Sequence, residues 1–468
     1  MKFGVTFLPE KEERSNVLSS TLLLFFIVAA FIVLKTARDA LFLSEYSSTN
    51  LPYLMAGNTA LSTIAAAVYL RLYRTVSLNV LLKSCLLIFA GGTLVFWEEV
   101  NSVLPGRSIW LYLWVGIIGT IAPVAAWTLV AKLFSARRGK RWLGVMGGGA
   151  ILGGIAGGFL ARWLSYVISV SSLLPAASLL LCLALLVSLP LSQSAAEISA
   201  SLEKENRTSR RRFITVMLLM VAVGTIVSAL IDFQFKSFTQ VELRSAKKMA
   251  TFFGSFYGYL GIGSLFLQLL ITPFLMKILG IHSTLMMLPL SLLISNGWLL
   301  VNPSFAASTF LRGSEELLRH SIDRSSLEVL YMAMPQETMV RVKSMVDMLA
   351  VRLPEGIASV GLIAMFSLGK MPLSLLAVIN MALLLFWLAC ALFLGRHEYP
   401  QLLKERISTG DFDVDSLKEN LLDDNFFAIL PELLKNAERD TVLNLINLVE
   451  GAGNKRFALR MSPALKRS

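Results

Sequence analysis

The sequence has little charge for its length. Only 16% of its 468 residues are Asp, Glu, Lys or Arg, while 55% are hydrophobic and the mean hydropathy is +0.66. A water-soluble protein carries about 25% charged residues, so this composition excludes an ordinary soluble globular fold. Long apolar runs recur from Leu22 to Leu394. A run of roughly 20 apolar residues is enough to span a hydrocarbon core, so a membrane protein is indicated.

Cysteine and histidine are also scarce, with three of each. The cysteines Cys85, Cys182 and Cys390 lie inside apolar runs and have no CxxC spacing, so neither a disulfide framework nor a zinc site is expected. The HExxH, GxSxG and Walker signatures are missing as well. The sequence therefore predicts no catalytic residues, no metal site, no cofactor and no enzymatic activity.

The formal net charge of +12 comes from basic residues that sit mainly in short loops between apolar runs. This distribution is the orientation signal of membrane proteins and argues against nucleic acid as a partner. Most of these residues fall on the side of the N-terminal stub, 1–18, so both termini are predicted to be cytoplasmic. The stub lacks the marks of a signal or transit peptide. These features favour the inner (cytoplasmic) membrane of a bacterium.

The apolar runs predict an all-α polytopic membrane protein with about twelve transmembrane helices. A cytoplasmic linker at 193–212 separates an N-terminal bundle, 19–192, from a C-terminal bundle, 213–394. Two six-helix bundles joined in this way are the plan of the major facilitator architecture. Lys236 is expected in the loop after the seventh span. The predicted spans are 19–43, 52–72, 79–97, 109–134, 143–162, 172–192, 213–235, 250–276, 284–301, 306–332, 345–368 and 372–394.

The composition changes after the last span, and the tail at 395–468 is too polar to cross a membrane. A capping box at 416–419 and an apolar stripe at 442–449 predict small helix pairs of the HEAT kind. So short a stack must bury its stripe elsewhere. We expect the tail to contact the cytoplasmic face of the bundle, further repeats or a regulatory partner.

Three charged residues lie inside the first apolar run. Lys35, Arg38 and Asp39 are spaced i, i+3 and i+4, so on a helix they share one face. Charges within a membrane helix normally face a polar interior, where they pair or bind substrate. The alternative is that Arg38 and Asp39 reach out to the membrane interface. Apolar residues continue at 40–43, which favours the interior.

The predicted spans at 306–332 and 345–368 are unusually charged. The pairs spaced for contact within one helix are Arg312 with Glu315 and Glu316, and Arg319 with Asp323. Such pairs neutralise part of the charge, and the rest must face water or other helices. Asp347 and Arg352 are five residues apart, so contacts with other helices or a substrate are expected of them.

Glycine recurs along the predicted span at 143–162, largely at four-residue spacing. The stretch has no Gly-Lys-Ser/Thr ending and no preceding strand, so it is not a phosphate-binding loop. Glycines at this spacing predict close packing against a neighbouring helix.

Residues 328–347, EVLYMAMPQETMVRVKSMVD, are similar without gaps to the pattern KEMAYIPLDEELKVKGKAAID of the nucleotide transporter family. This family comprises the ATP:ADP antiporters of plastids and intracellular bacteria. Residues 34–41, LKTARDAL, resemble its LRDTKDTL segment. Family members of this kind can carry HEAT-like repeats after the membrane part. The positions that match the two segments, identically or in charge, are Lys35, Arg38, Asp39, Glu328, Tyr331, Lys343 and Asp347.

The resemblance implies that these seven residues form the substrate-binding site. In this reading, Lys35, Arg38 and Lys343 balance the charge of an anionic solute. The carboxylates Asp39 and Glu328, together with Asp347, pair with these cations when the site is empty. Three departures from the family pattern leave strict ATP/ADP exchange open, namely Arg138, Ala333 and Met339.

The predicted function is therefore secondary transport of an anionic solute, a nucleotide or another phosphorylated compound, by alternating access. Exchange of the ATP:ADP type is what the resemblance implies. One alternative is a proton-coupled transporter of a non-nucleotide solute, in which Asp39 or Asp232 takes up the proton. A further alternative is a membrane sensor or scaffold that signals through its HEAT-like tail.

Overall fold

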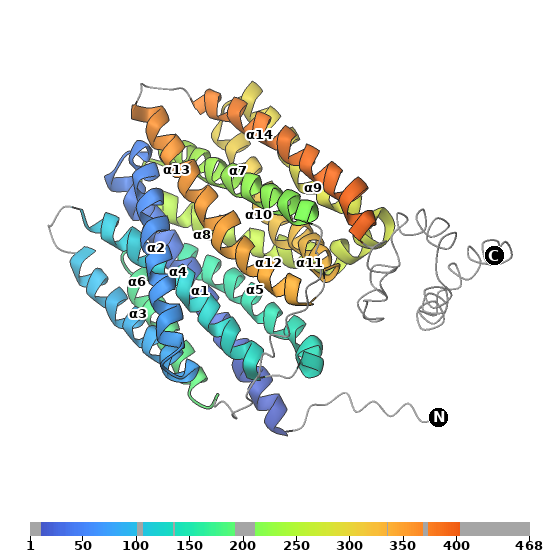
Figure 1. Ribbon diagram of the computed structural model, residues 1–468. Helices are drawn as coiled ribbons and strands as arrows, with labels where there is room; N and C mark the ends of the chain where they lie inside the picture. Colours follow the sequence, from blue (N-terminus) through green and yellow to red (C-terminus); the bar gives the residue numbers. More distant parts are fainter. Residues whose placement is uncertain are drawn as a thin grey trace, which may run out of the picture. The chain divides into compact units, whose positions relative to one another are not determined.

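A computed structural model describes residues 11–100, 106–133, 136–191, 211–334, 336–367 and 373–402, and these ranges are almost entirely helical. Figure 1 shows long helices joined by short turns. The predicted tail at 395–468 is described only as far as residue 402, so its HEAT-like part lies outside the described residues. The same holds for the linker at 193–212 up to residue 210.

The first six helices correspond to the first six predicted spans. They are α1 (Lys11–Glu45), α2 (Leu51–Tyr73), α3 (Leu78–Val100), α4 (Arg107–Leu133), α5 (Ala136–Val167) and α6 (Leu173–Ser188), with the short 3₁₀ helix η1 (Ser48–Asn50) before α2. Helix α1 packs against α4, α5 and α6, and α3 packs against α4 and α6. The charged stretch of α1 is therefore surrounded by other helices.

The later helices are interrupted by π-helical turns. They are α7 (Arg211–Leu243), α8 (Ala246–Phe266), η2 (Leu267–Ile271), α9 (Thr272–Val301), α10 (Phe305–Leu318), η3 (Arg319–Asp323), α11 (Arg324–Met332), α12 (Gln336–Met345), η4 (Val346–Val351), α13 (Arg352–Ser367), α14 (Leu373–Phe393) and η5 (Leu394–Glu398). Gly280, with a φ of 69°, breaks the helical line within α9. The break falls in the loop predicted between the eighth and ninth spans.

The helices form two compact units. The first unit comprises Met1–Leu202, Phe233–Leu265 and Ser359–Met371. The second comprises Glu203–Asp232, Phe266–Ala358 and Pro372–Ser468, so α7 contributes residues to both. The bundle boundaries at 19–192 and 213–394 stay a prediction from the sequence.

Counted over the described residues, nine helical stretches are long and apolar enough to cross a membrane, and α6 is a shorter apolar helix. The tenth and eleventh predicted spans do not reach this standard. Their segments are helical but charged, and the π-turns η3 and η4 interrupt them. The chain is thus an all-α polytopic membrane protein, and the number of twelve spans remains a prediction.

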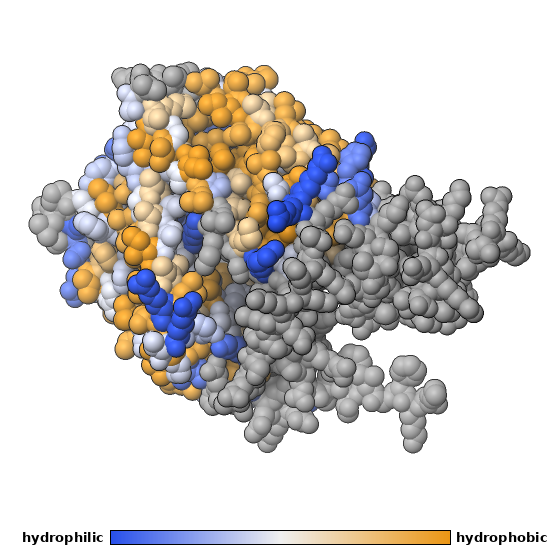
Figure 2. Space-filling model, viewed as in Figure 1, coloured by the Kyte–Doolittle hydropathy of each residue, from blue (hydrophilic) through white to orange (hydrophobic). Residues whose placement is uncertain are grey.

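Many side chains on the surface of the described residues are apolar, as contact with lipid requires. On the face shown in Figure 2, apolar side chains cover much of the described surface. Ile294 and Val301 of α9 are 74% and 86% exposed. Apolar exposure on this scale is unfavourable in water and favourable against lipid.

Gln240 of α7 fixes the end of α1 within the first unit. Its Nε2 donates to the carbonyl oxygens of Leu43 and Tyr46 at 2.6 and 2.7 Å, and its Oε1 accepts from the Ser48 amide at 2.7 Å. The last carbonyls of a helix have no partner within the helix, so this side chain serves as a cap supplied by another helix.

Replacing Gln240 with leucine is expected to lower the free energy of unfolding by about 2 kcal/mol, because each of its hydrogen bonds contributes about 1 kcal/mol or less. Thermal unfolding in detergent would measure the loss. The matched control is Gln268→Leu, since Gln268 lies exposed in η2. Equal stability of the two variants would show that the cap contributes nothing.

Candidate functional site

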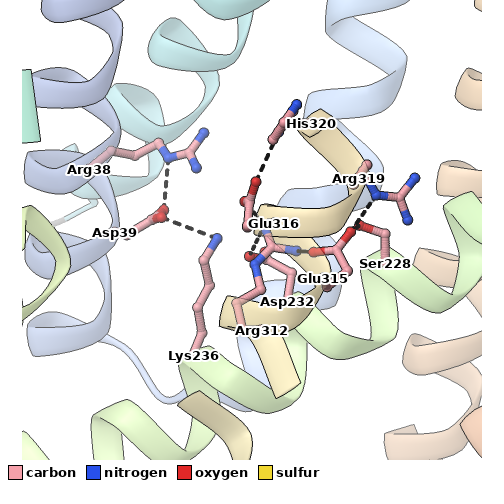
Figure 3. Close-up of polar contacts among 10 residues, drawn as sticks. All are labelled: Arg38, Asp39, Ser228, Asp232, Lys236, Arg312, Glu315, Glu316, Arg319 and His320. Carbon is pink, nitrogen blue, oxygen red and sulfur yellow. Dashed lines mark hydrogen bonds and ion pairs between the residues drawn. The ribbon is translucent and has the colours of Figure 1, made fainter. Parts of the chain in front are cut away.

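The first charged cluster lies within the first unit and centres on Asp39. The Arg38 Nε donates to Asp39 Oδ1 at 2.9 Å, and the Lys236 Nζ lies 3.2 Å from Asp39 Oδ2. All three side chains are buried, with 9%, 1% and 2% exposure for Arg38, Asp39 and Lys236. Figure 3 shows Asp39 between the two cations, which come from α1 and α7. Burial of these charges between two membrane helices is tolerated because the carboxylate lies between cations.

Tyrosine rings from two further helices face these cations. The Arg38 guanidinium lies 4.2 Å from the ring centre of Tyr112 in α4, and Lys236 lies 5.8 Å from the same ring. The Lys35 ammonium lies 4.2 Å from the ring centre of Tyr257 in α8. Aromatic faces attract cations most strongly away from water. The two tyrosines therefore stabilise all three cations, of which Arg38 and Lys236 contact Asp39.

These contacts test two predictions from the sequence, one for Arg38 and Asp39 and one for Lys236. Arg38 and Asp39 are buried and paired, so the alternative in which they reach out to the membrane interface is wrong. The placement of Lys236 in a loop is also wrong, because α7 continues to Leu243. The apolar run appears to stop at Phe235 only because the charged side chain lowers the average hydropathy there. Phe235 and Lys236 are in fact both fully buried.

The second charged cluster lies within the second unit, on α7, α10 and η3. Arg312 binds Glu315 at 2.5 Å, Glu316 at 2.6 Å and Asp232 at 3.3 Å. The predicted pairing of Arg312 with Glu315 and Glu316 is thus confirmed. Figure 3 shows the carboxylates drawn around this guanidinium. A planar guanidinium with five donors is suited to hold several carboxylates at once.

Arg319 binds within this cluster but not where the sequence spacing suggested. Its Nε donates to Glu315 at 2.5 Å and its terminal nitrogen donates to the Gly224 carbonyl oxygen at 3.0 Å. In the described part of the chain, Arg319 makes no hydrogen bond or ion pair with its predicted partner Asp323, although the two groups interact electrostatically. The π-turn η3 begins at Arg319 and changes the helical register, so the i,i+4 rule no longer places the two side chains together.

Lys343 and Glu328 form a third pair in the second unit, at 2.7 Å, and the Lys343 ammonium lies 5.0 Å from the Tyr331 ring centre. The structure thus brings together three of the four matched residues of the 328–347 segment. The fourth, Asp347, lies in η4, and its side chain is outside the described residues. Arg352 pairs with Glu355 at 3.7 Å. This short-range pair was not expected from the sequence.

The two larger clusters differ in the sign of their charge. The first brings the cations Arg38 and Lys236 to Asp39, with Lys35 against Tyr257, and the second gathers three carboxylates about two guanidinium groups. In the described part of the chain, no group of three or more His, Cys, Asp or Glu side chains is arranged to hold a metal ion. The first cluster is suited to bind an anion, and the second to bind a cation or a proton.

No family model and no curated protein matches the sequence. Solved structures do match. A D-xylose–proton symporter is 14% identical with a TM-score of 0.57, over 82% of this chain and 97% of that one. A bacterial homologue of the human lysosomal transporter Spinster, solved inward-facing and unoccupied, is 13% identical with a TM-score of 0.54, over 83% and 98%. A nucleoside transporter is 10% identical with a TM-score of 0.56, over 83% and 98%.

At such low identities these likenesses define a fold and leave the solute open. Each match extends over nearly the whole length of a polytopic helical transporter. This chain therefore has the same helical fold as these solved transporters.

Proposed function

We propose that the chain is a secondary transporter that moves an anionic, phosphorylated solute across a membrane by alternating access. The observation that carries the proposal is the gathering of Lys35, Arg38 and Lys236 within the first unit. Cations are costly to place among membrane helices, so such a group is retained where it has an anionic ligand to bind. The fold supplies a known framework for solute movement.

The chemistry of the three cations favours phosphate over other anions. A guanidinium presents N–H donors as a planar fork that matches two phosphate oxygens, and lysine adds point charges beside it. Arg38 contacts Asp39 through Nε. Asp39 would hold the cations in place between rounds of transport.

The finer proposal is a nucleotide, moved by exchange in the manner of the ATP:ADP antiporters. Its support is the resemblance of 34–41 and 328–347 to that family and the Lys343–Glu328 pair beside Tyr331. Lys35, Arg38, Asp39, Glu328, Tyr331, Lys343 and Asp347 would contact the solute. Lys236 joins them because it contacts Asp39.

Proton-coupled transport of a non-nucleotide solute is the second candidate. It is favoured by the carboxylates of Asp232, Glu315 and Glu316 around Arg312, since buried carboxylates in transporters commonly carry protons. A sensor or scaffold that signals through the tail remains a third candidate.

The tail is proposed to regulate transport and not to carry it out. Its first residues give this some support: Glu398 of η5 is buried and lies 3.5 Å from Arg212 at the start of α7. A tail attached to α7 in this way could restrain the movement of that helix. We propose that it does so when it meets its partner.

Uptake by purified protein in proteoliposomes tests the proposed function. Labelled nucleotides and other organic phosphates would be offered with and without the same compound inside. We expect exchange of at least one phosphorylated compound, and its loss in Lys35→Met and Lys343→Met. The control is Lys248→Met, since Lys248 is exposed at the start of α8. If correctly oriented protein moves no phosphorylated compound, the proposal is wrong. Uptake that follows a pH gradient without exchange would favour the second candidate.

A further inference from the structure

Asp323 is a buried carboxyl group that the proposed function does not use. It ends the π-turn η3 and is only 6% exposed. Among the described residues, no donor lies within hydrogen-bonding or ion-pair distance of its carboxylate. Burial of an ionised carboxylate without an ion pair or hydrogen bond is strongly unfavourable.

The nearby cations are already engaged with other carboxylates. Arg319 donates to Glu315 at 2.5 Å, and Arg312 binds Glu315, Glu316 and Asp232. Glu315 also accepts from the Ser228 hydroxyl at 2.8 Å, so its oxygens are well satisfied. The cluster thus holds the charges of three carboxylates with two guanidinium groups, and Asp323 adds a fourth acid beside them.

Charged groups act on Asp323 from several sides. Glu315 of α10 and the neighbours Arg319 and His320 of η3 interact with it electrostatically. Helices α9, α11 and η2 also pack against η3. The titratable and charged residues of these helices are Lys277 and His282 in α9, and Arg324, Glu328 and Tyr331 in α11, while η2 has none. Of these, His282 binds Arg396 and Glu328 binds Lys343.

His320 precedes Asp323 by three residues in η3 and interacts with it electrostatically. Its side chain is 57% exposed, and its Nε2 lies 3.0 Å from Glu316 Oε2. Imidazole exchanges protons readily near neutral pH, and chains of His and carboxyl groups are how transporters pass protons through a membrane. A metal cation would need about six oxygen ligands, whereas three of these carboxylates already bind guanidinium groups.

We propose that the cluster of Asp232, Glu315, Glu316 and Asp323 is a proton-binding site in which Asp323 holds the proton and His320 passes it in and out. The step is a transfer of one proton from the imidazolium of His320 to the carboxylate of Asp323, which leaves a neutral imidazole and a neutral carboxylic acid. The effect of this proton on transport rests on the proposed function, because a bound proton would make solute movement depend on pH.

The binding of the proton can be tested without any solute. Infrared difference spectra of the purified protein, recorded between a low and a high pH, show the carbonyl band of a protonated carboxyl group. We expect this band in the native protein and its loss in Asp323→Asn. The matched control is Glu398→Gln, a buried carboxylate that lies 3.5 Å from Arg212 in the same unit, and this variant should keep the band. A band unchanged in Asp323→Asn would overturn the proposal.

His320→Gln provides a second test if Asp323→Asn does not fold, because this exposed side chain can be replaced without disturbing the core. Loss of a neighbouring cation makes protonation of Asp323 easier, so the midpoint of the band should shift to higher pH. An unchanged midpoint would contradict the proposal.

Transport gives the last readout, in proteoliposomes with an imposed pH gradient. The gradient should change uptake of the exchanged phosphate compound by the native protein, while Asp323→Asn should keep exchange and lose the response. A native protein that shows the band but moves no solute would leave the proton site in place and refute the proposed function. A native response that survives in Asp323→Asn would overturn the role of the site in transport.

Discussion

Replacing Lys236 with methionine is expected to reduce solute uptake by at least about tenfold. Loss of one charged partner from a buried, hydrogen-bonded site costs about 2 kcal/mol or more, and 1.4 kcal/mol corresponds to a factor of ten in affinity. Lys236 is 2% exposed and lies 3.2 Å from Asp39, so water cannot replace its charge. Methionine keeps most of the volume of the side chain and removes only the ammonium group. Initial rates in proteoliposomes would measure the loss.

The single variant should also be less stable by about 3 kcal/mol, because the buried carboxylate of Asp39 loses a cation partner. The double variant Asp39→Asn/Lys236→Met separates the two effects. It removes one charge of each sign, so much of the stability should return, whereas uptake should remain low because a cation is still missing. If the double variant transports like the native protein, Lys236 serves only to balance Asp39 and has no part in solute binding. The exposed Lys248→Met should match the native protein in both measurements.

The sequence predicts the first cluster only in part. Lys35, Arg38 and Asp39 are conspicuous because they interrupt an apolar run, and their burial follows from that position. Lys236 also follows an apolar run, but it stands at the end of the predicted span 213–235. At that position hydropathy cannot distinguish a loop from a longer helix. Four residues before it stands Asp232, also on α7, and this spacing was a usable signal that the helix continues.

The aromatic partners could not have been predicted from the sequence. The chain has 10 tyrosines and 28 phenylalanines, and no local pattern marks Tyr112 or Tyr257 among them. Their position opposite the cations depends on how α4 and α8 pack against α1 in the first unit. Partners of this kind are set by tertiary structure alone.

The charged spans near 306–332 show where helical spacing rules apply and where they fail. Within α10 the i,i+3 and i,i+4 rules give the partners of Arg312 correctly. At η3 an additional residue per turn shifts the register, so Asp323 and Arg319 form no ion pair in the described part of the chain. Sequence spacing carries no sign of a π-turn, so the isolation of Asp323 became visible only in the structure.

Replacing Gly153 with alanine is expected to lower the free energy of unfolding by about 3 kcal/mol and to reduce transport strongly. A Cβ atom at Gly153 of α5 would lie 2.2 Å from the carbonyl oxygen of Phe25 in α1 and 2.9 Å from its Cα atom. The obstacle is backbone, so no side chain can turn away to make room, and overpacking of this kind costs about 1–3 kcal/mol. Gly149 and Gly157 approach α1 in the same way, with 2.6 Å to the carbonyl oxygens of Thr21 and Ala29.

Gly148→Ala is a matched control on the same helix, because a Cβ atom there would meet nothing within 4 Å. Alanine is the better helix former, so this variant should be unchanged or more stable by about 0.5–1 kcal/mol. Relative to the native protein, the melting temperature should therefore fall in Gly153→Ala and stay the same or rise in Gly148→Ala. Transport should follow, because α1 carries Lys35, Arg38 and Asp39, and a displaced α1 moves all three away from Lys236 and the tyrosine rings. Equal stability of Gly153→Ala and Gly148→Ala would mean that α1 and α5 can separate without cost, and the glycine spacing would then have no role in holding the charged helix in position.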